Sequence, residues 1–259
     1  MKNLFDLTGK VALVTGGSRG IGEMIAAGYV RSGARTYISA RKAEACDATA
    51  LRLSDGGECV SVPADLSTRD GIEALAGEIN SRESQLDILV NNAGAAWGEP
   101  IENYPEDGWD KVMNINVKSP FFLVQALLPL LEESATMEDP ARIISVGSVD
   151  GINVNRLPNY AYGPSKAAVH HLARVLAAHL ADRNITSNAI APGPFPSQMT
   201  AGIARQFGEE IQNGVPLKRW GEPADMAGVA IYLASQAASY VTGAVIPVDG
   251  GITGCAGTL

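Results

Sequence analysis

The sequence lacks the features of a membrane, nucleic-acid-binding or disulfide-stabilised protein. Its three cysteines, Cys46, Cys59 and Cys255, are far apart and form no CxxC pair, so we expect reduced thiols and no metal site. No apolar run approaches the roughly 18 residues of a membrane span, and the start, MKNLFDLTGKVALV, has no signal-peptide core. The formal net charge of −8 disfavours nucleic acid and anionic membranes as partners, because both need a basic surface. These absences favour a cytoplasmic globular protein.

Short apolar, β-branched runs alternate along the chain with longer segments of helical periodicity. The runs are KVALVT (10–15), RTYISA (35–40), ECVSVPA (58–64), LDILVNN (86–92), RIISVGS (142–148), ITSNAIA (185–191) and AVIPVD (244–249). Strict alternation of strand and helix predicts a parallel sheet with helices on both faces. Seven runs without a repeat or linker predict one α/β domain over residues 1–259, built on a doubly wound seven-stranded sheet. In such sheets ligands bind at the carboxyl ends of the strands.

A glycine cluster follows the first run. Gly16, Gly20 and Gly22 lie between the expected strand and the next helical segment, with the spacing GxxxGxG. Glycine lets the backbone approach a phosphate closely, and a helix N-terminus offers unpaired N–H groups and a positive dipole. Ordinary turns also collect glycine, but this position between strand and helix favours a dinucleotide-binding turn.

The end of the second run indicates which dinucleotide is bound. A carboxylate there would bond the ribose 2′-hydroxyl of NAD and repel a 2′-phosphate. The chain instead has Ala40 followed by Arg41, and Arg19 adds a second cation inside the glycine turn. Because guanidinium groups bind phosphate well, this pattern favours NADP(H). The alternative is that both arginines are ordinary solvated surface residues.

Eight stretches together resemble the short-chain dehydrogenase/reductase family. They are TGGSRGIG (15–22), ADL (64–66), NNAG (91–94), INV (115–117), Ser148, YGPSK (162–166), APG (191–193) and VTGAVIPVDGG (241–251). They occur in the family's order and cover nearly the whole chain. Within the family, GSVDGI, YAYGPSK, APGPFPSQMT and RWG most resemble bacterial NADPH-dependent 3-oxoacyl reductases of the rhamnolipid-associated branch.

The resemblance implies a Rossmann-type subunit, commonly in a tetramer, that moves hydride between NADP(H) and a carbonyl or alcohol. It also implies a set of cofactor-binding residues on the matching stretches. These are Gly16, Ser18, Arg19, Gly20, Ile21, Gly22, Arg41, Asp65, Leu66, Asn92, Ala93, Gly94, Tyr162, Lys166, Pro192, Gly193 and Ser197. Ser197 stands where the family often has a threonine.

Of the seven tyrosines, only Tyr162 has a lysine, Lys166, four residues later, whereas Tyr160 is followed at that spacing by Pro164. Four residues are about one helical turn, so Tyr162 and Lys166 share one helix face. Free tyrosine has a pKa of about 10 and donates protons poorly at neutral pH. A lysine ammonium about 4 Å away would contribute about 4 kcal/mol at an intermediate dielectric, equivalent to about three pKa units. We therefore expect Tyr162 to act as general acid, with Lys166 lowering its pKa and binding the nicotinamide ribose.

Two further catalytic residues are predicted. Ser148, at the end of the fifth run, would hydrogen-bond the substrate oxygen; Ser145 is a weaker candidate because it lies inside the strand. Asn116 would hold a water that links Lys166 to solvent, with Asn114 as the neighbouring alternative. His170, His171 and His179 follow on the same helical segment, but we expect no metal site from them.

Residues 194–220, after the sixth run, are expected to form a substrate lid. Phe195, Met199, Ile203 and Phe207 would make it apolar, and Trp97 would line the same cleft, although ordinary packing is the alternative for each. Together with Ser148 and Tyr162, the proposed substrate residues are Trp97, Phe195 and Met199. An apolar cleft favours an apolar or amphipathic ketone.

The leading prediction is an NADPH-dependent reductase of a 3-oxoacyl thioester or related apolar ketone. The alternative is an NADP-dependent alcohol dehydrogenase or carbonyl reductase acting on polyols, steroids or bulky secondary alcohols and ketones. An acyl-carrier-protein partner would need a basic rim, for which Arg142, Arg156, Lys218 and Arg219 are candidates. The long helical segments 105–134 and 160–182 and the VIPVDGG end favour a homotetramer, with a dimer as the alternative.

Overall fold

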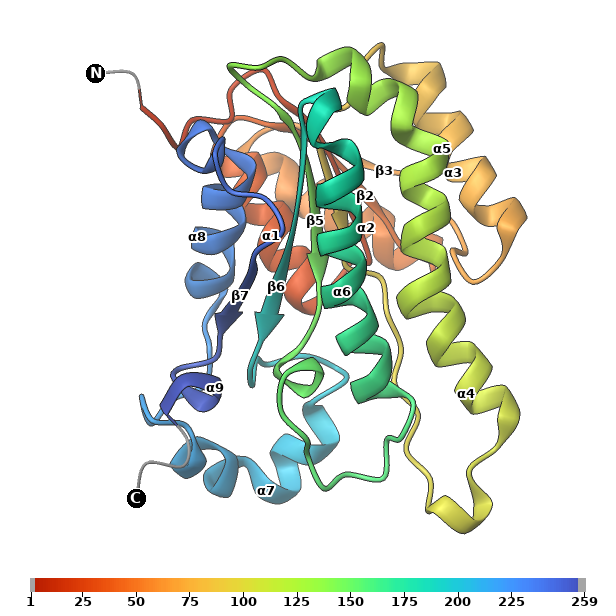
Figure 1. Ribbon diagram of the computed structural model, residues 1–259, viewed down its shortest axis with the longest axis vertical. Coiled ribbons are helices and arrows are strands. Elements are labelled where there is room, and N and C mark those ends of the chain that lie inside the picture. The colour runs from red at the N-terminus through yellow and green to blue at the C-terminus, as the bar shows by residue number, and fades with distance from the viewer. Residues whose placement is uncertain (1–2, 256–259) are drawn as a thin grey trace.

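A single parallel sheet forms the centre of the molecule in the computed structural model, which describes residues 3–255 except the side chain of Ile203. Its strands are β1 (Val11–Thr15), β2 (Arg35–Ser39), β3 (Cys59–Ser61), β4 (Ile88–Asn91), β5 (Ala141–Val146), β6 (Ile185–Pro192) and β7 (Val245–Val248). They pair in the order β3-β2-β1-β4-β5-β6-β7, all parallel. The strand order reverses between β1 and β4, so the ligand site is expected at their carboxyl ends, toward the bottom of Figure 1.

Helices cover both faces of the sheet. They are α1 (Gly20–Arg31), α2 (Ala43–Leu53), α3 (Arg69–Arg82), α4 (Glu106–Met113), α5 (Ser119–Ser134), α6 (Tyr162–Leu180), α7 (Ala201–Gly214), α8 (Pro223–Ala234) and α9 (Ile252–Cys255). Side chains of α1, α2 and α8 pack on one face, and those of α3, α5 and α6 pack on the other. The helix α7 lies beyond the carboxyl ends of the strands (Figure 1). The predicted fold class, a doubly wound seven-stranded parallel sheet, is confirmed.

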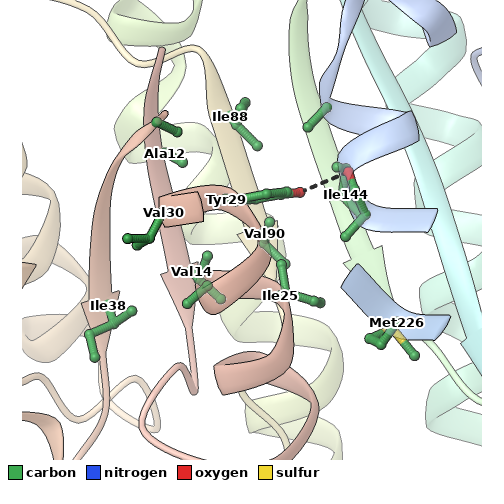
Figure 2. Close-up of a cluster of buried hydrophobic side chains, with 14 of the residues drawn as sticks. Ala12, Val14, Ile25, Tyr29, Val30, Ile38, Ile88, Val90, Ile144 and Met226 are labelled. Atoms are coloured by element: carbon green, nitrogen blue, oxygen red, sulfur yellow. Dashed lines mark hydrogen bonds between the residues drawn. The ribbon is translucent and has the colours of Figure 1, made fainter. Parts of the chain in front are cut away.

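Alternation along β1 shows why the sequence folds this way. Ala12 and Val14 point to one core cluster, whereas Val11 and Leu13 point to the other. A strand buried on both faces must be apolar at every position, which is why the runs are continuously apolar. Figure 2 shows the first cluster, in which Tyr29 of α1 lies among strand side chains and donates its hydroxyl to the Ala230 carbonyl at 3.2 Å.

The strand boundaries fall within a few residues of those predicted. The largest difference is at β3, predicted over 58–64 and observed over Cys59–Ser61. Pro63 has no N–H to donate to the neighbouring strand, so regular pairing ends before it. The N–H groups of Val62 and Ala64 still donate to Ile38 and Ala40, which keeps the chain against β2. The predicted domain, residues 1–259, includes residues 1–2 and 256–259, which lie outside the described part.

A charged network closes the amino ends of the strands, opposite the expected site. Asp87 accepts from Lys10 Nζ at 3.0 Å and from the Val11 N–H at 2.9 Å. The Asp139 carboxylate forms ion pairs with Lys10 Nζ at 2.6 Å and with the Arg142 guanidinium at 3.3 Å. The Arg142 side chain is only 1% exposed and also donates to the Ser235 carbonyl. The suggestion that Arg142 helps form a basic rim is therefore wrong, because it is buried at the start of β5.

Within residues 3–255, no helix combines the length and hydropathy needed to cross a membrane.

Candidate active site

The carboxyl ends of the central strands bring most of the predicted site residues together. The glycine turn follows β1, Asn92 to Gly94 follow β4, Ser148 follows β5, and Pro192 ends β6. Tyr162 begins α6, which packs across β5 and β6. Segments far apart in sequence thus meet at one edge of the sheet.

The glycine turn is built too tightly for side chains. Gly16 has φ +64°, in the left-handed region, and a Cβ there would lie 2.8 Å from Asn92 Nδ2. A Cβ on Gly22 would lie 2.3 Å from the Gly16 carbonyl oxygen and 2.4 Å from Asn92 Nδ2. Glycine is therefore required at both positions by the close approach of the β1 turn, the start of α1 and the β4 loop.

Hydrogen bonds fix the two loops to each other. Thr15 Oγ1 accepts from the N–H groups of Asn92 at 3.0 Å and Ala93 at 3.1 Å, while it donates to the Val90 carbonyl at 3.1 Å. Asn92 Nδ2 donates to the carbonyls of Thr15 at 2.8 Å and Gly16 at 3.2 Å. Thr15 and Asn92 thus hold the loops after β1 and β4 in register.

The start of α1 fits a dinucleotide phosphate. Arg19 is the N-cap residue, and its side chain makes no capping hydrogen bond to the N–H groups of the first helical turn. Such N–H groups, together with the helix dipole, bind anions. Gly16, Gly20 and Gly22 carry no side chains of their own, which allows a pyrophosphate to approach the backbone of the turn closely.

The two predicted phosphate-binding arginines are exposed, but each has a neighbour that sequence reasoning did not anticipate. Arg41 follows β2 and lies close enough to Asp65 to lower the pKa of that carboxyl, although hydrogen bonds from Ser67 lower it more. The guanidinium of Arg19 donates to Gln198 Oε1 in the segment after β6. Leu66, predicted beside the adenine, is 6% exposed and packs in the core.

Ser148, Tyr162 and Lys166 form one cluster between β5 and α6. Ser148 is 7% exposed, accepts from the Asp150 N–H at 3.1 Å and forms a side-chain hydrogen bond with Tyr162. Lys166 Nζ lies 5.6 Å from the centre of the Tyr162 ring and donates to the Val146 carbonyl at 2.8 Å. Ser145 lies inside β5, so Ser148 is the serine that faces the tyrosine.

The electrostatics of this cluster differ from the sequence-based expectation. Burial and, to a smaller extent, the Asp150 charge raise the pKa of Tyr162 to about 12, against the hydrogen bond with Ser148, which lowers it. Burial also lowers the pKa of Lys166 to about 8, against the Asp150 charge, which raises it. The predicted lowering of the Tyr162 pKa by Lys166 is thus not seen, because the buried ammonium is directed at the Val146 carbonyl.

Asn116 lies in a π-helical turn, Asn114–Lys118, between α4 and α5. Its Oδ1 accepts from the Ala95 N–H at 2.8 Å, and its Nδ2 donates to the Ala95 carbonyl at 3.0 Å and to Ser165 Oγ at 2.9 Å. Asn116 is 2% exposed, whereas Asn114 is exposed. The π turn, a feature frequent at functional sites, directs Asn116 inward.

Comparison with known proteins agrees with this arrangement. A family model described as Enoyl-(Acyl carrier protein) reductase matches residues 16–253. The Rhamnolipids biosynthesis 3-oxoacyl-[acyl-carrier-protein] reductase of Pseudomonas aeruginosa is 54% identical over 97% of this chain and 99% of its own length. The short-chain dehydrogenase/reductase PhomF of Diaporthe leptostromiformis is 33% identical over 96% of this chain and 93% of its own. The solved Pseudomonas aeruginosa RhlG/NADP active-site complex superposes with a TM-score of 0.95 at 53% identity, covering 98% of this chain and 100% of that one.

The chain belongs to the short-chain dehydrogenase/reductase family. These relatives confirm the prediction that the protein is an NADP-dependent oxidoreductase.

The predicted substrate residues of this short-chain dehydrogenase/reductase lie in different environments. Phe195 is 2% exposed and packs on Gly221, whose Cβ would lie 2.3 Å from the phenyl ring, so its side chain belongs to the core. Trp97 packs on Gly108 of α4, with Lys111 Nζ 5.0 Å from its ring centre. Met199 is 51% exposed and remains available to a ligand.

The segment 194–220 contains α7, which has a non-helical residue, Phe207, at its middle. Ser197 approaches the glycine turn: its Cβ lies 3.3 Å from where a Cβ of Gly20 would be. The backbone of Ser197 is held by Thr200 Oγ1 at 2.9 Å. The start of the predicted lid thus lies against the glycine turn, where Arg19 also binds Gln198.

Two residues of the site were missed by sequence reasoning. Asp150 lies two residues after Ser148, and its carboxylate acts on both Tyr162 and Lys166. His170 is 4% exposed and accepts from the Ser148 N–H at 3.4 Å; burial lowers its pKa to about 4. His170 lies four residues after Lys166, so helical spacing alone places it on the same helix face as the catalytic lysine.

Proposed function

We propose that the protein reduces the ketone of a 3-oxoacyl thioester, or a related apolar ketone, to a secondary alcohol with NADPH. The observation that carries this proposal is the Ser148, Tyr162 and Lys166 cluster beside the glycine turn at the carboxyl ends of β1, β4 and β5. The likeness to a rhamnolipid 3-oxoacyl reductase supports the substrate class.

Residues of the protein itself would donate and accept the proton of the reaction. When bound, NADPH supplies the hydride that adds to the carbonyl carbon. As the carbonyl oxygen gains negative charge, Tyr162 Oη donates its proton to it and Ser148 Oγ donates a hydrogen bond to the same oxygen. Lys166, whose Nζ is fixed by the Val146 carbonyl, would hold the nicotinamide ribose. In the reverse direction Tyr162 accepts the proton from the alcohol.

Asn116 would position this machinery through its neighbours. Its amide holds Ala95 in the loop after β4 and Ser165, the residue before Lys166. A Cβ on Gly94 would lie 3.1 Å from Asn116 Oδ1 and 3.7 Å from Lys166 Nζ, so a glycine separates the two side chains. The predicted proton relay through Asn116 stays a prediction.

Exposed apolar side chains support an apolar substrate. They lie on the loop after β5 and on the segment after β6: Ile152, Val154, Leu157, Tyr160, Met199 and Phe207. Tyr160 packs edge-on against Tyr104, with ring centres 5.5 Å apart, which anchors this loop. Two of the suggested basic-rim residues are engaged internally: Lys218 donates to the Asn213 carbonyl and Arg219 pairs with Asp225. A basic docking rim for a carrier protein therefore gains no support from them.

The test is to follow NADPH and NADH consumption on four substrates: acetoacetyl-CoA, an aryl ketone, a cyclic ketone and crotonyl-CoA. We expect the fastest turnover with acetoacetyl-CoA and NADPH. Turnover of only the bulky ketones would favour the alternative, a general carbonyl reductase. Turnover of only crotonyl-CoA would make the protein an enoyl reductase, as the description of the matching family model suggests.

We further propose a cytoplasmic homotetramer. Exposed aromatic side chains on α4 and α5, Trp109 at 41% and Phe121 at 41%, support an interface along these helices. Val175 of α6, exposed at 39%, supports a second contact on the same side of the sheet. Light scattering on the eluting protein would give the mass of four chains; a mass of two chains would favour the dimer.

A further inference from the structure

Asp150 is an acidic group in the site with no role in the mechanism above. It lies in the 3₁₀ turn Val149–Gly151, which packs directly on α6. A Cβ on Gly151 would lie 2.7 Å from the carbonyl carbon of Lys166, and one on Gly163 would lie 3.2 Å from the Asp150 carbonyl oxygen. Turn and helix therefore meet backbone to backbone, which brings Asp150 close to the catalytic face of α6.

The contacts of Asp150 leave its charge without an ion-pair partner among residues 3–255. The backbone N–H donates to Ser148 Oγ at 3.1 Å, and the half-buried carboxylate hydrogen-bonds the side chain of Asn155. No lysine, arginine or histidine of the described chain lies within ion-pair distance of it. Burial raises the pKa of Asp150, while the hydrogen bond with Asn155 and the charge of Lys166 lower it, and no ion pair in the described part of the protein shields its carboxylate from Tyr162 and Lys166.

The titratable groups that face Asp150 come from α6. They are Tyr162 and Lys166, while His170 of the same helix packs on the neighbouring Gly151, and β6, which also packs on the turn, contributes no titratable side chain. The Asp150 carboxylate raises the pKa of both Tyr162 and Lys166. His170 is neutral near pH 7, because burial lowers its pKa to about 4.

We propose that Asp150 is a positioning residue whose carboxylate keeps Tyr162 protonated and Lys166 charged, and thereby favours ketone reduction over alcohol oxidation. A tyrosinate beside a carboxylate would place two negative charges in one partly buried region, which is unfavourable. Tyr162 therefore remains a proton donor to higher pH. In oxidation Tyr162 must act as a base, so the same charge moves oxidation to more alkaline pH. This inference rests on the proposed function.

The N–H of Asp150 adds a geometric effect. By donating to Ser148 Oγ it occupies one acceptor position of that hydroxyl. The hydroxyl hydrogen of Ser148 is then directed away from the turn, toward the Tyr162 oxygen and the substrate oxygen beside it. This backbone contact is retained when the side chain of Asp150 is changed, so side-chain variants isolate the effect of the charge.

The test is the pH profile of kcat/KM for NADP⁺-dependent oxidation of a 3-hydroxyacyl-CoA. In Asp150→Asn and Asp150→Ser, we expect the limb that reports Tyr162 ionisation to shift down by about one pH unit. Asp150→Glu, which keeps the carboxylate, should have the wild-type pH profile. Asp55→Asn, which removes an exposed carboxylate from a distant 3₁₀ turn, is the matched control and should leave the profile unchanged. Melting temperatures would verify that each variant is folded.

A second measurement follows the ionisation of Tyr162 directly, by NMR, without cofactor or turnover. In protein labelled with ¹³C at the tyrosine ζ carbon, the resonance absent from Tyr162→Phe should begin to titrate at lower pH in Asp150→Asn than in the wild type. Unchanged titration and an unchanged oxidation profile would overturn the inference, even if Tyr162→Phe is inactive. Retained turnover in Tyr162→Phe would instead overturn the proposed function.

Discussion

A methyl group added to Gly22 tests whether the nucleotide turn is as tightly built as the structure shows. The new Cβ would lie 2.3 Å from the Gly16 carbonyl oxygen, about 1 Å inside normal contact, and 2.4 Å from Asn92 Nδ2. Overpacking of this kind costs about 1–3 kcal/mol. Displacing Asn92 from the carbonyls of Thr15 and Gly16 costs about 1 kcal/mol more. The better helix propensity of alanine returns about 0.5–1 kcal/mol.

The net expectation for Gly22→Ala is a loss of about 1–3 kcal/mol in the free energy of unfolding, or about 2–12 °C in Tm. NADPH affinity, measured by fluorescence titration, should fall at least about tenfold because the turn that receives the phosphate is displaced. Gly77→Ala is the matched control: Gly77 is exposed on α3 and a Cβ there meets nothing within 4 Å. It should raise Tm by about 1–4 °C and leave NADPH binding unchanged. A Gly22→Ala protein that is as stable as Gly77→Ala and binds NADPH normally would refute the reasoning.

Three further outcomes are expected. Asp87→Ala should lower the free energy of unfolding by about 2–4 kcal/mol in a urea titration, because it leaves the buried Val11 N–H unpaired and removes one partner of Lys10. For His170, burial lowers the folded-state pKa to about 4, below an unfolded value of about 6.5. Its contribution to stability is therefore complete above pH 6.5 and is lost as the pH falls toward 4, by about 2–3 kcal/mol. His170→Gln should flatten that part of the stability profile, and an equal slope in both proteins would contradict the assignment. Arg41→Ala should raise the KM for NADPH about tenfold or more while the KM for NADH stays constant. Equal changes for both coenzymes would mean that Arg41 does not bind the 2′-phosphate.

Much of the fold could be predicted because it depends on local pattern. The strands of a parallel sheet are buried on both faces, so their apolar β-branched runs stand out in the sequence. The Tyr162 and Lys166 pair could be found because helical spacing alone places them on one face. The glycine turn was recognisable because the close approach of Gly16 and Gly22 to their neighbours excludes other residues.

The predictions that did not hold depend on contacts between distant segments. Phe195 could not be assigned to the core from its neighbours in sequence, since its packing partner Gly221 lies in another segment. Arg142 is buried because the Ser235 carbonyl, in the turn after α8, lies against the start of β5. The pKa of Tyr162 was expected to fall beside a lysine, but burial and Asp150 determine its direction. The helical spacing of Tyr162 and Lys166 carries no information about the burial of Tyr162 or about the charge of Asp150.

The central claim is that Tyr162 supplies the proton in an NADPH-dependent ketone reduction. The most direct measurement compares wild type and Tyr162→Phe for NADPH consumption on acetoacetyl-CoA, with NADPH binding measured separately on each protein. We predict that the variant binds NADPH with the wild-type Kd and loses about 10²–10⁴-fold in kcat, the usual contribution of general acid catalysis. A variant that binds NADPH and keeps turnover within about threefold of the wild type would contradict the assignment of Tyr162 as general acid.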